Sequence, residues 1–208
     1  MTIFFILVII NEKNMKNTLI VTAHPSSLGF THKIAESYKK SIEENGWNAE
    51  ILDLYKKENT QDFLHFENVK TDFPQDELTI KMHDRISQAD EIVLVAPVWW
   101  GQVPAIMKNF IDTNFWAGFA FKYEKWGKIV GLLKWKTARV FLTCDAPGFI
   151  YKFLPFANRL TGYFGMYVFG FCGMKVSGVH IFDNMHKNKD ELSRNKMLEK
   201  VSKLAKKS

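Results

Sequence analysis

Residues 91–106 read EIVLVAPVWWGQVPAI, and this stretch decides the fold. Its first six residues contain an apolar run that is typical of a parallel β-strand buried on both faces. A loop with two adjacent tryptophans follows, and Pro104 then stands where a helix tolerates proline, in its first turn. The stretch therefore predicts a buried strand, a chemically unusual loop and a helix, in that order.

The same alternation of strands and helices continues along the chain. Apolar runs predict strands at 19–23, 47–54, 91–96, 138–143 and 175–182, and helical spacing predicts helices at 31–45, 76–89, 105–114, 160–172 and 189–206. We therefore expect an α/β three-layer sandwich, with a five-stranded parallel sheet in the order 2-1-3-4-5 and helices on both faces. In that order the loops after strands one, three and four meet at one edge of the sheet, where ligands bind.

The composition is that of a globular protein. The chain has 208 residues, of which 47% are hydrophobic and 24% charged, so a disordered chain or a disulfide scaffold is excluded. Cys144 and Cys172 lie in apolar sequence without metal-binding spacing, which favours buried thiols in a reducing cytoplasm and no metal site. Most of the net charge of +6 comes from residues 187–207, and no nucleic-acid module is recognisable.

The first residues form a separate segment. Residues 2–10 are an apolar run that is too short for a membrane span of about 20 residues, and no basic residue precedes it. We interpret residues 1–14 as an extension before a functional start at Met15, and residues 15–208 as a single domain. An anchor at a membrane surface is the alternative interpretation of the extension.

The loop after the first strand carries groups that suit an anion. Residues 23–32 read AHPSSLGFTH, and a helix starts near Thr31. The amino terminus of a helix offers unpaired N–H groups and the positive end of its dipole. His24, Ser26, Ser27 and Thr31 add donors for a phosphate, although the hydroxyls equally suit a helix cap. The loop lacks the glycine pattern of a dinucleotide fingerprint and the lysine of a P-loop.

The loops after strands three and four supply an aromatic wall and polar groups. Trp99 and Trp100 follow a buried strand, so we expect one to pack inward and the other to line a cleft for a flat ring; packing alone is the alternative. Thr143 and the backbone beside it are placed to contact a ring edge, and Tyr151 offers a phenol donor. Cys144 has no base beside it in sequence, which favours a core thiol over a nucleophile.

Together these motifs resemble those of the flavodoxin-like NAD(P)H:quinone oxidoreductases, the family of the DT-diaphorase and modulator of drug activity type. The resemblance spans residues 18–182 and rests on the histidine loop, on residues 97–108 (PVWWGQVPAIMK) and on residues 118–121 (GFAF). It implies a flavodoxin-like fold, a flavin cofactor, either FMN or FAD, and NAD(P)H as the electron donor.

The resemblance also implies roles for single residues. His24 and Phe30 match residues at the phosphate and ribityl end of the flavin, and Tyr151 matches a catalytic tyrosine that faces the substrate. The residues that match the cradle of the flavin ring are Pro97, Val98, Trp99, Trp100, Gly101, Thr143, Cys144 and Asp145. The chain departs from the family pattern at Gly29, where serine is usual, at residues 143–146, and at Ala157, where the DT-diaphorase type has histidine.

The resemblance implies an enzyme that passes hydride from NAD(P)H through the flavin to a quinone or a similar small electrophilic acceptor, as a cytoplasmic homodimer. Residues 160–174 fit a helix buried against a partner subunit or within one subunit. The alternative functions are a non-catalytic flavoprotein, acting as an electron carrier or as a regulatory subunit of a membrane transporter, and a related fold without flavin. The apolar residues 2–10 and the basic tail also suit a peripheral membrane contact.

Overall fold

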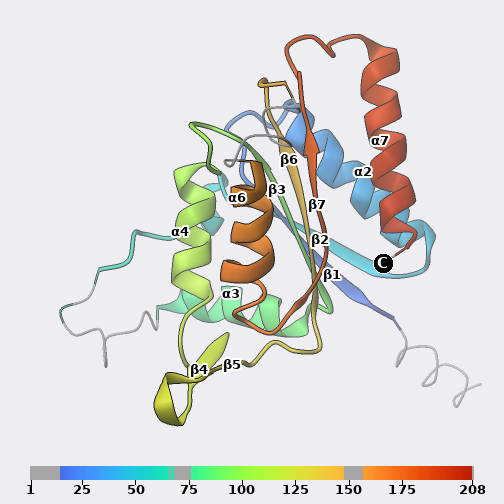
Figure 1. Cartoon of the computed structure of the whole chain (residues 1–208). Helices are drawn as coiled ribbons and strands as arrows, with labels where there is room; N and C mark the ends of the chain where they lie inside the picture. Colours follow the sequence, from blue (N-terminus) through green and yellow to red (C-terminus); the bar gives the residue numbers. More distant parts are fainter. Residues whose placement is uncertain (1–14, 66, 68–75, 148–156, 208) are drawn as a thin grey trace, which may run out of the picture.

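The computed structural model describes residues 15–65, 67, 76–147 and 157–207. Within these residues, five parallel strands form one sheet in the order β2-β1-β3-β6-β7. The strands are β1 (Asn17–Thr22), β2 (Asn48–Asp53), β3 (Glu91–Pro97), β6 (Thr137–Thr143) and β7 (Lys175–Phe182). Numbered only within this sheet, the order is 2-1-3-4-5, so the predicted topology is confirmed (Figure 1).

Helices cover both faces of the sheet (Figure 1). One face carries α2 (Phe30–Glu44) and α7 (Glu191–Ala205), which are joined by a hydrogen bond of 2.8 Å from the Ser41 hydroxyl to the Ser202 hydroxyl. The other face carries α3 (Glu77–Gln88), α4 (Ala105–Asn114), α6 (Ala157–Gly162) and the π-helix η3 (Tyr163–Val168). No helix in the described part of the chain is long and apolar enough to cross a membrane.

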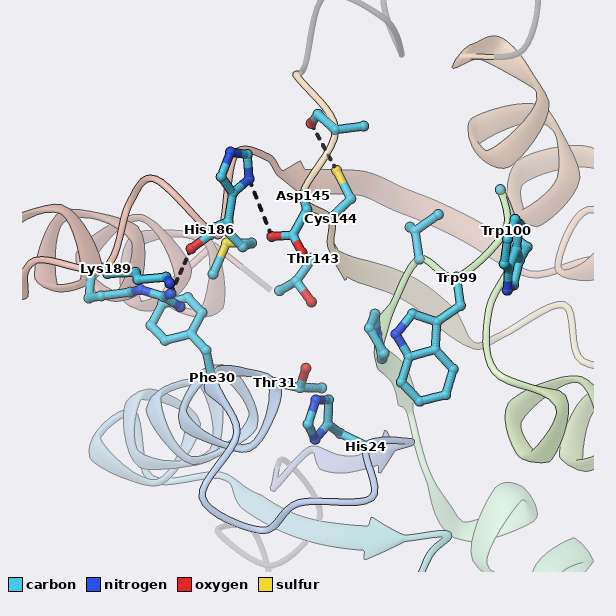
Figure 2. Close-up of a pocket in the computed structure, with 16 residues that line it drawn as sticks. His24, Phe30, Thr31, Trp99, Trp100, Thr143, Cys144, Asp145, His186 and Lys189 are labelled. Atoms are coloured by element: carbon cyan, nitrogen blue, oxygen red, sulfur yellow. Dashed lines mark hydrogen bonds and ion pairs between the residues drawn. The ribbon is translucent and has the colours of Figure 1, made fainter.

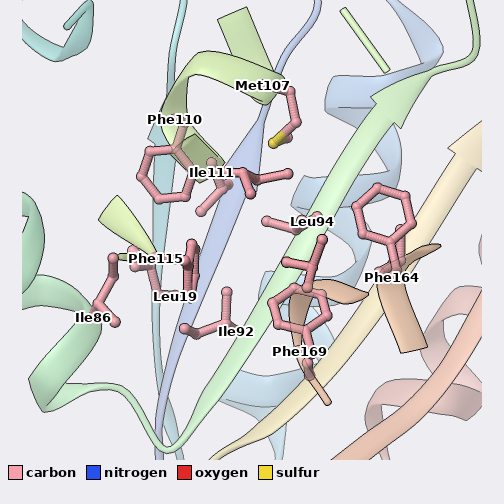
Figure 3. Packing of buried hydrophobic residues seen from close by; sticks show 14 of the residues in the cluster. Leu19, Ile86, Ile92, Leu94, Met107, Phe110, Ile111, Phe115, Phe164 and Phe169 are labelled. Carbon is pink, nitrogen blue, oxygen red and sulfur yellow. The ribbon is translucent and has the colours of Figure 1, made fainter. Parts of the chain in front are cut away.

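The sheet separates two apolar cores, and neighbouring residues of one strand point into different cores. Leu19 of β1 and Ile92 of β3 pack in the core beneath α3, α4 and η3, which Figure 3 shows. Ile20 and Val93, the next residue along each strand, pack in the core beneath α2 and α7. Because both faces of these strands are buried, their sequences are continuous apolar runs rather than alternating ones.

A hairpin interrupts the aromatic stretch 115–136, which the sequence predicts to be irregular. Strands β4 (Phe121–Tyr123) and β5 (Ile129–Gly131) pair antiparallel, and the short 3₁₀ turn η2 (Lys125–Gly127) forms the tip. Each strand has three residues, too few to show a period of two in the sequence. The base of the hairpin packs tightly, since a Cβ on Gly131 would lie 2.2 Å from the carbonyl carbon of Cys172.

The predicted helix at 160–172 is not a continuous α-helix. The chain forms α6, then η3, and then turns up to Gly173, whose φ of +79° is in the left-handed region. A Cβ on Gly170 would lie 2.6 Å from the Gly165 carbonyl oxygen, so the tight turn requires glycine there. The polar composition of residues 55–75 predicts a loop, and over its described residues this stretch is a loop apart from the 3₁₀ turn η1 (Lys57–Asn59).

Candidate functional site

The carboxyl ends of β1, β3, β6 and β7 surround one cavity of about 540 Å³ (Figure 2). All but two of the residues that the sequence predicts to bind a cofactor line this cavity: His24, Phe30, Thr31, Pro97, Val98, Trp99, Trp100, Gly101, Thr143, Cys144 and Asp145. The exceptions are Ser26 and Ser27. The structure therefore brings the three predicted loops together at the predicted edge of the sheet.

The loop after β1 holds the imidazole of His24 against its own backbone. The Nδ1 atom of His24 lies 3.1 Å from the Ser26 nitrogen and 3.0 Å from the Ser26 carbonyl oxygen. Nδ1 meets one donor and one acceptor, so the tautomer decides which bond forms. This contact turns the loop so that Ser26 and Ser27 are exposed away from the cavity, and their predicted role as phosphate donors stays a prediction.

Gly29 has two consequences for the start of α2. A Cβ at this position would lie 2.7 Å from Nδ1 of His24, so only glycine leaves room for the imidazole where it stands. Gly29 is also the N-cap of α2 and supplies no side-chain hydrogen bond to the helix. Among the described residues, the N–H groups of Phe30 and Thr31 have no acceptor. The amino terminus of α2 thus faces the cavity with free donors.

The loop after β3 forms a tight turn that presents its tryptophans. Trp99 and Gln102 exchange backbone hydrogen bonds of 2.7 and 3.0 Å around Trp100 and Gly101, whose φ values are +53° and +75°. Positive φ at both central residues is typical of a type I′ turn and is uncommon for tryptophan. The predicted inward packing of one tryptophan is wrong: Trp99 is 42% exposed and Trp100 fully exposed.

Trp99 nevertheless lies at the cavity, and Figure 2 shows its indole beside His24. The two rings are 6.4 Å apart between centroids and tilted by 56°. Trp100 lies farther out, at the mouth (Figure 2). The sequence rule that one of two adjacent aromatic residues packs inward fails here because a type I′ turn, not a strand, sets their directions.

The loop after β6 contributes a hydroxyl, a thiol and a carboxylate. Thr143 is buried at the end of the strand, where its carbonyl oxygen accepts a 2.7 Å hydrogen bond from the N–H of Val98. The Cys144 thiol is 4% exposed and donates to the Ala146 carbonyl oxygen at 3.6 Å. Asp145 is exposed, with an oxygen 3.7 Å from Nδ1 of His186.

The cavity has a fourth wall that sequence reasoning missed. Met185, His186, Lys189 and Arg194 line it from the loop after β7 and from α7. For the residues of the loop, the predicted strand order contained the signal, because this loop also leaves the carboxyl edge of the sheet. From the sequence alone, the lysines of this loop count only toward the basic segment 187–207.

Arg194 is the most firmly held of these four residues. Its Nη2 atom donates to the Met185 carbonyl oxygen at 3.0 Å, and its Nε atom donates to the Asn188 carbonyl oxygen. The guanidinium lies over the Phe30 ring, 4.3 Å from the centroid. Burial lowers the pKa of Arg194 against the opposing effect of Asp145 and Asp190. A half-buried cation therefore joins α2 and α7 at the end of the cavity where α2 begins.

Tyr151, the residue predicted to be catalytic, lies outside the described residues.

A second, more apolar groove of about 870 Å³ lies on the α4 and η3 face, lined among others by Phe115, Phe121, Tyr123, Tyr163 and Phe171. Burial, reinforced by the charge of Asp112, raises the pKa of Tyr163 to about 12, so this phenol stays protonated at neutral pH. The groove is separate from the cavity at the carboxyl edge.

Comparison with known proteins gives one family and several relatives. The family model described as "Flavodoxin-like fold" matches residues 16–205. An uncharacterized NAD(P)H oxidoreductase of Haemophilus influenzae is 35% identical over 188 residues, which cover 88% of this chain and 91% of the relative. An FMN-dependent NADH:quinone oxidoreductase of Clostridium beijerinckii is 35% identical over 161 residues, which cover 74% of this chain and 77% of the relative.

A solved structure agrees in fold. The NAD(P)H:quinone oxidoreductase from Methanothermobacter marburgensis superimposes with a TM-score of 0.82, over 92% of this chain and 98% of that one. The sequence identity is 22%, so this likeness concerns the fold alone.

Proposed function

This chain belongs to the family of the flavodoxin-like fold, and from that premise we propose that it is a flavin-dependent NAD(P)H oxidoreductase that passes hydride to a quinone or a similar small electrophilic acceptor. The observation that carries the proposal is one cavity with an indole at one end and a cation beside a free helix terminus at the other. A flavin mononucleotide has the same polarity, with a flat ring at one end and a phosphate at the other.

The donor set of the cavity fits this group. At one end, the N–H groups of Phe30 and Thr31 and the guanidinium of Arg194 suit a phosphate. At the other end, the backbone N–H groups of Trp100 and Gly101 have no acceptor among the described residues and suit the polar edge of a heterocycle. A volume of about 540 Å³ is within the usual range for a cofactor site.

A bound flavin supplies the hydride transfer, while the protein supplies position and electrostatics. Trp99 would cover part of the ring system and exclude water from it. His24 would hold the phosphate end, because its ring is fixed by Ser26 and by the absence of a side chain at Gly29. Tyr151 would donate a hydrogen bond to the acceptor oxygen as negative charge develops there.

The names of the curated relatives favour FMN as the cofactor and NADH as a donor. We also propose that the protein is cytoplasmic, which is supported by Cys144 and Cys172 as buried thiols that form no disulfide with each other. Small-molecule acceptors are favoured by the open mouth of the cavity beside the exposed Trp100.

The same proposal includes a homodimer. It is supported by the apolar groove of about 870 Å³, which leaves Tyr123 and Tyr167 63% and 66% exposed. Exposed aromatic side chains gathered in one apolar groove are typical of a protein interface. Light scattering on the purified protein should give twice the mass of the chain, and a Phe171→Lys variant in the groove should give the monomer mass. A monomeric parent protein would contradict this part.

Turnover tests the enzymatic proposal. Oxidation of NADH and NADPH should be measured with a soluble benzoquinone for the parent protein, for Tyr151→Phe and for a control, Tyr55→Phe, at a tyrosine that does not line the cavity. We expect Tyr151→Phe to lower kcat for the quinone by roughly tenfold to a hundredfold while NADH reduces the bound flavin at the parent rate. Unchanged quinone kinetics would remove Tyr151 from catalysis. Bound flavin without turnover would favour the non-catalytic flavoprotein.

A further inference from the structure

His83 on α3 contacts two aromatic residues of the segment that leads from α4 into the β4–β5 hairpin. The Nε1–H group of Trp116 donates to the Nε2 atom of His83 at 3.2 Å. The ring of Phe119 stacks on the same imidazole, with the centroids 3.9 Å apart and the planes 5° from parallel. None of the three residues lines the cavity at the carboxyl edge. The cluster therefore requires an explanation other than flavin binding.

Trp116 and Phe119 stand on a tight turn that is closed by backbone hydrogen bonds. The Trp116 carbonyl oxygen accepts from the N–H groups of Phe119 at 3.3 Å and of Ala120 at 3.0 Å. Gly118 within the turn has a φ of +100°, and β4 begins directly after it at Phe121. Figure 1 shows α3 and the hairpin at the same end of the molecule. The imidazole thus holds the two side chains of the turn from which the hairpin starts.

This turn forms part of the wall of the apolar groove of about 870 Å³ that supports the proposed homodimer. Trp116 lines the groove together with Phe121 and Tyr123 of β4. Phe121 in turn packs edge-on against Phe171, another residue of the groove, with the ring centroids 5.4 Å apart. The direction of the Trp116 indole therefore affects the shape of the surface that a second copy would meet.

The hydrogen bond from Trp116 requires a neutral imidazole. The indole nitrogen is only a donor, so Nε2 of His83 must offer a lone pair, which it loses on protonation. Burial lowers the pKa of His83 below its ordinary value of 6.5, against the opposing charges of Asp84 and Asp76. These two carboxylates belong to α3 and its N-cap, and residues 116–120 on the other side contain no titratable side chain. At neutral pH the imidazole is therefore uncharged and accepts the bond.

We propose that His83 is the positioning residue of the apolar groove, and that its neutral imidazole favours the homodimer by fixing the Trp116 indole before association. This inference rests on the proposed homodimer and adds to it a dependence on pH. A side chain that is already ordered loses no freedom on association, so affinity is gained. Protonation removes the acceptor for Trp116 but leaves the stack on Phe119, since a cation also packs on an aromatic face. Acid therefore frees the indole without removing the other contact.

The dimer dissociation constant of the protein with FMN, measured by analytical ultracentrifugation at pH 7.5 and pH 5.0, tests the inference. We expect it to rise by about fivefold to tenfold at the lower pH, because one indole in each copy must then be ordered on association. His83→Gln keeps an acceptor near the position of Nε2 but cannot titrate. Its dimer should match the parent at pH 7.5 and should not respond to pH. His83→Phe keeps the stack without an acceptor, so its dimer should be about tenfold weaker at both pH values.

Two further variants serve as controls. His186→Gln replaces a histidine that lines the cavity and not the groove, so its dimer should respond to pH as the parent does. Trp116→Phe removes the donor, so the addition of His83→Phe to this variant should weaken the dimer no further. Unchanged thermal unfolding shows that the variants fold.

A second readout reports the hydrogen bond without the dimer. The indole N–H signal of Trp116 in a proton–nitrogen correlation spectrum, identified by its loss in Trp116→Phe, should move with pH in the parent and stay fixed in His83→Gln. A parent dimer that does not respond to pH, with an equally stable His83→Phe dimer, would overturn this inference and leave the homodimer standing. A monomeric parent would overturn the homodimer and this inference with it, while quinone turnover remains the separate test of the enzyme.

Discussion

Exposed tryptophans stand at both edges of the sheet, and the two edges differ in what surrounds them. At the carboxyl edge, Trp99 and Trp100 border a cavity of about 540 Å³ with free backbone donors and a hydroxyl. At the amino edge, Trp135 borders a space of about 170 Å³, and lysines flank both Trp135 and Trp126, which stands at the tip of the β4–β5 hairpin. The residue type is the same, so what distinguishes the two edges is what surrounds the indoles: a cavity with free donors at one edge and lysines at the other.

The largest expected effect concerns His180, in the sheet between the two edges. We expect this residue to affect the free energy of unfolding rather than the affinity for a ligand. His180 on β7 stacks on Phe141 at 5.3 Å, and its Nε2 atom is buried without a partner among the described residues. Burial, with the charges of Arg139 and Lys200, lowers the pKa of His180 from 6.5 to about 4. Between these two pH values the unfolded chain binds a proton that the folded protein does not. The free energy of unfolding should therefore fall by about 3 kcal/mol as pH drops through this window.

Urea unfolding at several pH values checks this expectation. His180→Leu should flatten the pH dependence between pH 6.5 and 4, whereas the control His186→Leu, at an exposed position of the cavity, should retain it. The same slope in both variants would show that His180 is not the group responsible.

The next effect concerns the cation at the carboxyl edge. Arg194→Ala removes two hydrogen bonds to loop carbonyls and the cation over Phe30, so affinity for FMN should fall by about thirtyfold, or about 2 kcal/mol. Titration of FMN fluorescence measures this affinity. Lys203→Ala removes a charge from the same helix away from the cavity and should leave the affinity unchanged. Equal affinities in parent and Arg194→Ala would place the phosphate elsewhere.

The third effect concerns Gly29, because serine is usual at this position in the family that the sequence resembles. Gly29→Ser adds a hydroxyl but also a Cβ that would lie 2.7 Å from Nδ1 of His24. We expect the displaced imidazole to matter more, so affinity for FMN should fall by about tenfold. Gly46→Ser is the control, at a φ of +78° in open space. It should cost about 1 kcal/mol in stability without changing affinity. Tighter binding of FMN to Gly29→Ser would contradict the role of the glycine.

The smallest effect compares one tryptophan from each edge. Trp99→Ala should weaken FMN binding by about fivefold, since an aromatic contact contributes about 1 kcal/mol. Trp135→Ala, at the other edge, should leave FMN affinity unchanged. A similar loss in both variants, measured by the same titration, would mean that the edges are not separate sites.

The sequence predicted the sheet well because the strands are buried on both faces. The apolar residues of β1 and β3 alternate between two cores, so no polar position interrupts the run. The β4–β5 hairpin escaped prediction because each of its strands has only three residues, too few to show a period of two. The helix expected at 160–172 is interrupted by η3 and by the turn in which Gly170 lies against the Gly165 carbonyl oxygen, and apolar helical spacing does not distinguish this path from a regular α-helix.

The site was predictable as far as topology determines it. The strand order places the loops of His24, Trp99 and Thr143 at one edge, and the structure brings them to one cavity. Arg194 could not be found in this way, because its contact with Phe30 arises only when α7 packs on α2. Residue type alone favours Ser26 and Ser27 as phosphate donors, but the Ser26 backbone bonds to His24 and neither serine lines the cavity.

The central claim is that the cavity at the carboxyl edge binds a flavin that a nicotinamide reduces. The most direct measurement is the visible absorbance spectrum of the purified protein with FMN, recorded under anaerobic conditions before and after addition of NADH or NADPH. Our account predicts the spectrum of a bound, oxidised flavin that bleaches on addition of at least one of the two donors. A protein that retains no flavin after gel filtration, or a bound flavin that neither donor bleaches, would contradict it.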